Sequence, residues 1–276
     1  RFYTPNFNCY MKTIIIIPAR FHSSRLPGKP LAKLGGQTML ERVVNIAKAV
    51  MTHKEVEVMV ATEDKRIADY AATLKVKVAL TRDTCLTGTD RVAEALAQLD
   101  KTYDLVINLQ GDAPLTPPDF LHTMIQAFCD RPCDVITPVT QLSWLELEQL
   151  RLQKSLTPFS GTTALFQQET GRAYWFSKQI LPAIRHEEKL KQCEGKSPVF
   201  RHIGLYGYTP GVLKRYVALP ETDYERYEGL EQLRMIEQGF DVRCIPVEYL
   251  GRPNMSGIDS ATDLARADAL LKAYES

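Results

Sequence analysis

The sequence predicts an α/β protein built on a doubly wound, mostly parallel sheet. Residues 14–17 are four consecutive isoleucines, a run too apolar for a sheet with one solvated face and suited to a strand covered on both faces. Segments with strand and helix patterns then alternate along the first half of the chain. This alternation is typical of βαβ units and a parallel sheet.

The individual elements follow from the same patterns. Strands are expected at 13–18, 56–61, 76–80, 105–109, 199–208 and 242–249. Helices are expected at 39–51, 65–74, 90–100, 224–238 and 260–274, and Thr89 or Asp90 is the expected cap of the third. Residues 11–276 are interpreted as a single domain, with 1–10 as an extension ahead of Met11 and 141–197 as an irregular inserted subregion, because polar residues interrupt the alternation there.

Composition excludes several classes of function. The 276 residues carry 34 Lys and Arg against 33 Asp and Glu, so a net charge of +1 provides no general attraction to nucleic acid or to an anionic membrane. No apolar run approaches the roughly 20 residues of a membrane span, and the first ten residues lack a signal-peptide pattern, so a cytoplasmic location is expected. The six cysteines are scattered and are expected to be reduced thiols without a zinc site.

Three cations, Arg20, Arg25 and Lys29, follow the first strand. Because ligands of parallel α/β sheets bind beyond the carboxyl ends of the strands, this loop is a candidate site for a nucleoside triphosphate; a solvated basic loop is the alternative. A P-loop is excluded, since Gly28 has no glycine five residues before it and Pro30 replaces the required Ser or Thr. The dinucleotide fingerprint G-x-G-x-x-G is absent as well.

Two acids extend this candidate site. Asp112 follows the strand at 105–109, at the same sheet edge as the basic loop, and Asp259 stands at the start of the last helix. Mg²⁺ typically takes one or two carboxylates plus substrate phosphates. The alternatives are a turn before Pro114 and a helix N-cap, respectively. Residues 81–91 add hydroxyls and a glycine at an expected helix amino terminus, which either attracts anions and base edges or is only a capped helix.

Ten short motifs stand in colinear order along nearly the whole chain from Met11. They are Ile17-Pro-Ala-Arg20, Arg25-Leu-Pro-Gly-Lys29-Pro30-Leu, Val60-Ala-Thr-Glu-Asp64, Thr81-Arg82, Gly88-Thr-Asp-Arg91, Gln110-Gly-Asp112, Phe176-Ser, Arg201-His202-Ile-Gly-Leu-Tyr206, Leu230-Glu231-Gln232-Leu-Arg234 and Asp259. Together these motifs resemble the CMP-Kdo synthetases, or 3-deoxy-manno-octulosonate cytidylyltransferases. The CMP-sialic acid synthetases share the amino-terminal loop but are not expected to match the two motifs at 201–206 and 230–234.

The resemblance implies a nucleotide-diphospho-sugar-transferase-like fold. It also implies transfer of CMP from CTP to the anomeric hydroxyl of 3-deoxy-D-manno-octulosonate (Kdo), with release of pyrophosphate, for lipopolysaccharide synthesis. Arg20, Arg25 and Lys29 would hold the triphosphate and stabilise the charge that moves to the leaving group, and Asp112 and Asp259 would hold Mg²⁺. The other residues implied at the nucleotide are Ala19, Ser23, Arg82, Gly88 and Gln110.

For the sugar, the resemblance implies Gln110, Arg185, His202, Tyr206, Glu231 and Gln232. Kdo carries a carboxylate and several hydroxyls, which require cationic or N–H donors and polar side chains. Glu228 and Gln232 are expected on one face of the helix at 224–238 because they are four residues apart. On residue types alone, His202 and Tyr206 are instead inward strand residues with satisfied hydrogen bonds. The resemblance further implies a homodimer, with 141–197 as a candidate contact. The charge balance and the lack of a long apolar run predict no nucleic-acid or membrane partner.

The sequence departs from the family motifs at Cys85, Leu86, Thr87, Ala113, Lys178 and Ile184. Lys178 stands where the family has arginine, and the two side chains are not equivalent where a planar carboxylate is recognised. Two alternative functions therefore remain: CMP activation of another ulosonic acid, of the 8-amino-Kdo or sialic acid type, and an inactive nucleotide-binding homologue.

Overall fold

The computed structural model describes residues 11–23, 25–51, 55–255 and 257–275 of the chain. These residues form two compact units. The first unit comprises the described residues up to 131 together with 205–217 and 249–275, and the second comprises 132–204 and 218–248. Among the described residues, no helix combines the length and apolar character needed to cross a membrane.

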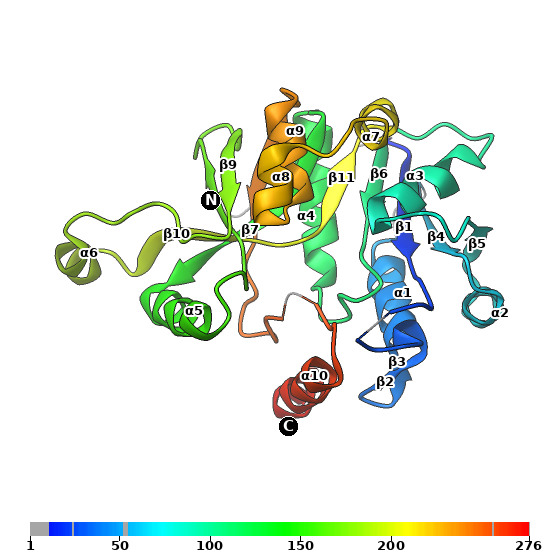
Figure 1. The fold of residues 1–276 in the computed structure, drawn as a ribbon, viewed down its shortest axis with the longest axis horizontal. Helices are drawn as coiled ribbons and strands as arrows, with labels where there is room; N and C mark the ends of the chain where they lie inside the picture. The colour runs from blue at the N-terminus through cyan, green and yellow to red at the C-terminus, as the bar shows by residue number, and fades with distance from the viewer. Residues whose placement is uncertain (1–10, 24, 52–54, 256, 276) are drawn as a thin grey trace. The chain divides into compact units, whose positions relative to one another are not determined.

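The first unit contains five strands that pair in the order β5-β4-β1-β6-β11, and among these pairs only β6-β11 is antiparallel (Figure 1). Its strands are β1 (Thr13–Pro18), β4 (Val56–Thr62), β5 (Lys77–Leu80), β6 (Leu105–Asn108) and β11 (Tyr206–Tyr208), with a separate hairpin of β2 (Lys33–Leu34) and β3 (Gln37–Thr38). Its helices are η1 (Lys29–Leu31), α1 (Met39–Ala49), α2 (Lys65–Thr73), α3 (Gly88–Ala97), α4 (Pro118–Asp130), α7 (Pro210–Val217) and α10 (Ala261–Glu275).

The chain reverses its direction across this sheet after β5. It moves outward from β1 to β4 and β5, then returns past β1 to β6. Because crossover connections are right-handed, α1 and α2 cover one face of the sheet and α3 the other. All six residues of β1 are buried, as the run of isoleucines predicted. The predicted doubly wound, mostly parallel sheet is therefore confirmed.

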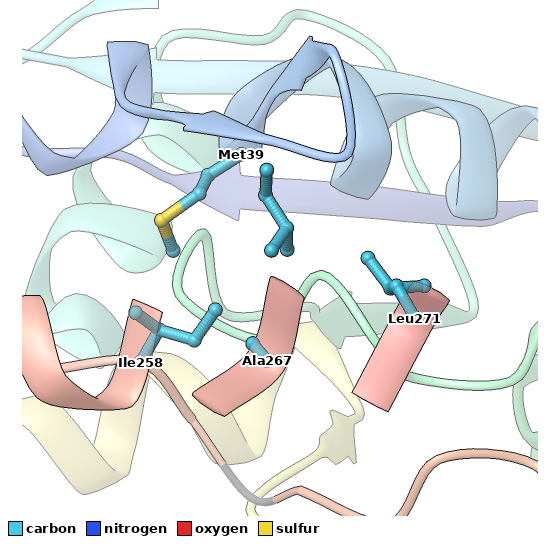
Figure 2. Packing of buried hydrophobic residues seen from close by; sticks show 5 residues of the cluster. Met39, Ile258, Ala267 and Leu271 are labelled. Carbon is cyan, nitrogen blue, oxygen red and sulfur yellow. The ribbon is translucent and has the colours of Figure 1, made fainter. Parts of the chain in front are cut away.

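The carboxyl-terminal helix α10 packs beside the β2-β3 hairpin through a small apolar cluster. Figure 2 shows Met39, from the start of α1, with Ile258, Ala267 and Leu271 from the carboxyl-terminal segment converging on a shared space. Leu34 of β2 completes the buried set. This cluster places the residues just before α10, including Asp259, beside the amino-terminal part of the chain.

The second unit contains five strands that pair in the order β12-β7-β10-β8-β9, in which β7 (Val135–Ser143) runs parallel to β12 and antiparallel to β10. Its other elements are α5 (Trp144–Leu156), β8 (Thr163–Phe166), β9 (Ala173–Ser177), α6 (Glu187–Cys193), β10 (Lys196–His202), α8 (Asp223–Glu228), α9 (Glu231–Glu237) and β12 (Val242–Pro246). The segment at 141–197, expected to be irregular, thus contains two complete helices and two complete strands.

Three predicted elements differ from those observed. The strand expected at 199–208 is two strands, β10 and β11, which belong to different units. The helix expected at 224–238 is divided into α8 and α9, because Gly229 adopts a left-handed conformation with φ of 64° and ends α8. The cap of α3 is Thr87, whose hydroxyl accepts a hydrogen bond from the Asp90 N–H at 3.0 Å, and not Thr89 or Asp90.

The cysteines also differ in part from the expectation of reduced thiols. Cys85, Cys133, Cys193 and Cys244 are free, but Cys129 is disulfide-bonded, so the prediction is wrong for Cys129. Cys9 lies outside the described residues.

Candidate active site

The candidate site lies at the carboxyl ends of β1 and β6, which are neighbours in the sheet. The chain leaves β1 toward β4 on one side and reaches β6 on the other, so this is the point where the strand order reverses. Loops diverge at such a point and leave room for a ligand. Residues 19–29 follow β1, and Gln110, Gly111 and Asp112 follow β6.

Backbone contacts fix the first part of the loop after β1. The Ala19 N–H donates to the Ala61 carbonyl oxygen at 2.9 Å, and the Phe21 N–H donates to Glu63 Oε1 at 2.9 Å. Glu63 in turn pairs with Arg91 of α3 at 2.9 Å, with only 9% and 4% of their side chains exposed. The loop is thus anchored to β4 and, through Glu63, to α3. Sequence reasoning assigned no role to Glu63 or Arg91, although both lie within the family motifs.

A tight turn at Gly28 then brings Lys29 back toward the sheet. Gly28 has a φ of 68°, which favours glycine, and its N–H donates to the Phe21 carbonyl oxygen at 3.0 Å. A Cβ at this position would also lie 3.2 Å from the Phe21 ring. Lys29 begins η1 directly after the turn, so its side chain points inward and is only 12% exposed.

Lys29 joins the two predicted metal-binding carboxylates. Its Nζ lies 2.9 Å from Asp112 Oδ2 and 3.0 Å from Asp259 Oδ1. Arg25 Nη2 lies 3.2 Å from the other oxygen of Asp259. The Ile258 N–H donates to the carbonyl oxygen of Asp112 at 2.9 Å, so the backbone also holds the two acidic segments together. Lys29, Asp112 and Asp259, which were predicted to belong to one site, therefore lie together in the structure, although ion pairs between the lysine and the two acids were not predicted.

Two glycines allow the loops of this site to approach closely. A Cβ at Gly111 would lie 2.7 Å from the carbonyl oxygen of Pro18, and a Cβ at Gly88 would lie 2.8 Å from Gln110 Oε1. Gln110 Nε2 donates to Asn108 Oδ1 at 2.9 Å, which orients the amide. The amino terminus of α3 therefore lies directly against the end of β6.

A cavity of about 130 Å³ opens between these segments, and most of the predicted nucleotide residues line it. The lining includes Ala19, Arg20, Lys29, Gly88, Gln110 and Asp112. The same cavity is lined by Asp259 and by three residues that differ from the family motifs, Cys85, Leu86 and Thr87. Burial raises the pKa of the Cys85 thiol to about 11, so it is protonated at neutral pH and is not a nucleophile.

Arg82 and Ser23 are placed differently. Arg82 Nε lies 2.9 Å from Glu94 Oε2, and Arg82 lines a separate cavity of about 790 Å³ beside α3 and α7. Ser23 is half-buried, and its Oγ accepts a weak hydrogen bond from the Leu26 N–H at 3.4 Å. The structure therefore does not bring Arg82 into the lining of the smaller cavity.

Among the predicted sugar residues, His202 and Gln232 lie together inside the second unit. His202 Nε2 lies 2.8 Å from Thr137 Oγ1, its Nδ1 lies 3.5 Å from Gln232 Nε2, and its ring packs edge-on against Phe176 at 5.0 Å. Burial lowers the pKa of His202 to about 3. His202 is therefore neutral at physiological pH and offers hydrogen bonds, not charge.

The other residues predicted for the sugar lie in different places in the structure. Gly229 separates Glu228 from Gln232, so the prediction that they share one helix face is wrong. Glu231 is half-buried at the start of α9, and Arg185 is exposed. Tyr206 is buried on β11 of the first unit, where its ring stacks on Tyr208 at 5.9 Å.

Lys178 and Glu228 form a second polar group within the second unit. The backbone N–H of Lys178 donates to Glu228 Oε2 at 2.5 Å, and Lys178 Nζ donates to Thr162 Oγ1 at 3.2 Å. Burial lowers the pKa of Lys178, because a low-dielectric surrounding disfavours the charged form. The lysine that replaces the family arginine thus has a defined place beside a carboxylate.

The donor set at Asp112 and Asp259 fits Mg²⁺. Both carboxylates already converge on one cationic nitrogen, Lys29 Nζ. In the described part of the chain, no group of three or more His, Cys, Asp or Glu side chains gathers at one point. A site with two carboxylates suits a cation that completes its shell with water and substrate phosphates.

Comparison with known proteins agrees with this geometry. The family model described as cytidylyltransferase matches residues 14–244. A 3-deoxy-manno-octulosonate cytidylyltransferase of Maricaulis maris is 39% identical over 95% of this chain and 98% of its own length. The enzyme of the same name from Phocaeicola vulgatus is 36% identical over 96% of this chain and 99% of its own length.

A solved structure shows the same similarity. It is CMP:2-keto-3-deoxy-manno-octonic acid synthetase in complex with CTP, which superimposes with a TM-score of 0.80 at 33% identity and covers 96% of this chain and 100% of the other. The chain therefore belongs to the cytidylyltransferase family, among the 3-deoxy-manno-octulosonate cytidylyltransferases.

Proposed function

We propose that this protein transfers CMP from CTP to the anomeric hydroxyl of Kdo and releases pyrophosphate. The observation that carries the proposal is the convergence of Lys29, Asp112 and Asp259 at the reversal point of the sheet, in a chain 39% identical to an enzyme named for this activity. In the reaction, a bond forms between the anomeric oxygen and the α-phosphorus. The bond from the α-phosphorus to the oxygen that bridges it to the β-phosphate breaks.

The residues of the first unit would act mainly by position and charge. Arg20, Arg25 and Lys29 would bind the triphosphate and stabilise the charge that accumulates on the departing pyrophosphate. Asp112 and Asp259 would hold Mg²⁺, whose contribution when bound is to neutralise phosphate charge. Phosphoryl transfer requires little covalent participation from the protein, so a site made of cations and carboxylates is sufficient.

The residues proposed for sugar recognition are Gln110, Arg185, His202, Tyr206, Glu231 and Gln232. A neutral His202 would contribute a hydrogen bond to a sugar hydroxyl. Because it carries no charge, the carboxylate of the sugar would have to be bound by a cationic side chain elsewhere. Lys178 stands where the family has arginine and is a compact point charge on a flexible stem. This difference favours testing modified ulosonic acids beside Kdo.

The direct test is pyrophosphate release from CTP and Mg²⁺ with Kdo, 8-amino-Kdo or sialic acid as the acceptor. We expect Kdo to be the best acceptor. Preference for 8-amino-Kdo or sialic acid would establish the alternative specificity. CTP binding without turnover on any acceptor, across a screen of pH and metals, would identify an inactive homologue and overturn the proposal.

Asp112→Asn tests the metal-binding role, because it removes a charge with little change of volume. We expect loss of turnover with an unchanged melting temperature. Asp69→Asn is the matched control, since Asp69 pairs only with exposed Lys65 on α2 in the described structure. Activity of the Asp112→Asn protein within a few-fold of the parent would remove Asp112 from the metal site.

We also propose that the protein is a cytoplasmic homodimer that uses α5 as part of its contact. Leu145, Leu152 and Leu156 on α5 and Phe159 just beyond it are exposed, and their spacing places them along one side of a helix. Leu152→Glu with Leu156→Glu should convert the dimer to a monomer in sedimentation experiments, whereas Leu250→Glu, at an exposed leucine of the first unit, should not. Monomeric parent protein would contradict the proposal.

A further inference from the structure

The two cations nearest to the predicted metal site are bound to its carboxylates. Lys29 contacts one oxygen of Asp112 and one of Asp259, at 2.9 and 3.0 Å, and Arg25 contacts the second oxygen of Asp259 at 3.2 Å. Three of the four carboxylate oxygens thus face a cation of the protein. The Lys29 side chain is 12% exposed and the Arg25 side chain 67%, so Lys29 is the more firmly held of the two.

A divalent cation shared by both carboxylates would compete with Lys29. The Lys29 ammonium already donates a hydrogen bond to one oxygen of each carboxylate. Two positive charges in contact in a partly buried site repel strongly, so a divalent cation held by Asp112 and Asp259 would displace Lys29 from them. Lys29 and Arg25 are also the cations proposed to bind the triphosphate, and a triphosphate offers them alternative anionic partners.

We propose that Lys29, assisted by Arg25, is a placeholder cation that couples loading of the metal to loading of the triphosphate. Lys29 neutralises the two aspartates until the triphosphate draws it away, and the aspartates then accept the metal. This inference rests on the proposed function for the identity of the triphosphate. It predicts that metal and nucleotide each raise the affinity for the other by the same factor, because binding linkage is reciprocal.

The first test measures binding of Mn²⁺ alone, by electron paramagnetic resonance of the free ion. Lys29→Met should bind Mn²⁺ about 5- to 150-fold more tightly than the parent, the usual range of a coupling between sites. Arg25→Met should show a smaller gain, and because this side chain is 67% exposed the change does not alter a buried position.

Arg20→Met is the matched control for this test. It removes an equal charge from the same loop, and among the described residues Arg20 forms no ion pair with either aspartate. An equal gain in the Arg20→Met protein, or no gain in either the Lys29→Met or the Arg25→Met protein, would overturn the inference.

The second test measures CTP binding in a metal chelator by calorimetry. Asp112→Asn should bind CTP several-fold more tightly than the parent, because Lys29 is then released from one of its partners. In a Lys29→Met background the same Asp112→Asn change should bring no gain. If Asp112→Asn still tightens CTP binding in the Lys29→Met background, the gain comes only from the removal of a negative charge, and the placeholder role is refuted.

The outcomes separate this inference from the proposed function. Pyrophosphate release by the parent protein, combined with unchanged Mn²⁺ binding by Lys29→Met, would refute the placeholder and leave the enzyme assignment intact. Coupled Mn²⁺ and CTP binding without turnover on any ulosonic acid would refute the reaction alone.

Discussion

Gly111 gives the sharpest test of how the site is built, because a single methyl group there meets the backbone of the neighbouring loop. A Cβ at this position would lie 2.7 Å from the carbonyl oxygen of Pro18 and 3.6 Å from Cβ of Ala19. The nearer atom is a main-chain atom at the end of the buried strand β1, which cannot rotate away. Gly111→Ala must therefore displace the turn that carries Asp112, or the loop that carries Arg20.

The size of the effect follows from that distance. Non-bonded atoms are most stable at about 3.5–4.0 Å, so the turn must move by roughly 0.8 Å or more. Overpacking of this kind costs about 1–3 kcal/mol, which lowers the melting temperature of a chain of this length by about 2–12 °C. Because a displacement of about 1 Å in a catalytic group can cost ~100-fold in rate, we expect kcat/KM to fall at least about tenfold.

Differential scanning calorimetry and the pyrophosphate assay measure the two effects separately. Gly195→Ala is the matched control, since a Cβ at Gly195 meets no described atom within 4 Å. We expect that control to leave both quantities unchanged. A Gly111→Ala protein with the melting temperature of the parent and kcat/KM within about twofold would show that the approach of β6 to Pro18 does not position the site.

Three further changes probe stability and the nucleotide pocket. Burial holds the pKa of His202 at about 3, so as pH falls below about 6.5 the unfolded state takes up a proton before the folded state does, and stability is lost toward pH 3. His202→Gln should therefore flatten the dependence of the melting temperature on pH between 4 and 6.5. An unchanged slope would contradict a buried neutral imidazole. Arg234→Met should lower the free energy of unfolding, measured in urea, by about 3–5 kcal/mol. The arginine donates two hydrogen bonds of 2.6 Å to Glu225, and its removal leaves that carboxylate buried without a cation. A loss below about 1 kcal/mol would show that solvent replaces the ion pair. Thr87→Ala removes the reciprocal cap with Asp90 and should lower the free energy of unfolding by about 1 kcal/mol. It should also weaken CTP binding, because α3 begins beside the cavity. Unchanged CTP affinity would show that the cap does not position the nucleotide site.

Much of the first unit could be predicted from local sequence alone. The strand at 13–18 was predicted to the residue, because only a strand covered on both faces accommodates four consecutive isoleucines. The helix that starts near residue 88 was predicted two residues late, because Thr87, Thr89 and Asp90 are all suitable caps and only the hydrogen bonds of the folded chain distinguish them. Local patterns therefore predict an element well and its ends less well.

Features that depend on distant partners could not be predicted in this way. The Lys29 and Asp259 side chains meet across 230 positions of sequence, and no local pattern indicates that a lysine expected to bind phosphate would contact both acids. Residue type already indicated an inward position for His202, but the size of the fall in its pKa depends on how completely the second unit buries the ring. The division of the helix at 224–238 depends on Gly229, whose left-handed conformation was not distinguished from a tolerated helical glycine.

The position of Asp259 also has a consequence for biosynthesis. The strands of the first sheet that hold Lys29 and Asp112 emerge early, and an amino-terminal region generally folds first during synthesis at about 5–20 residues per second. Asp259 reaches Lys29 only when α10 packs against Leu34 and Met39. A nascent chain can therefore complete its parallel strands while Lys29 has only one of its two acidic partners, and the second partner arrives only after residues 259–271 have been translated and packed.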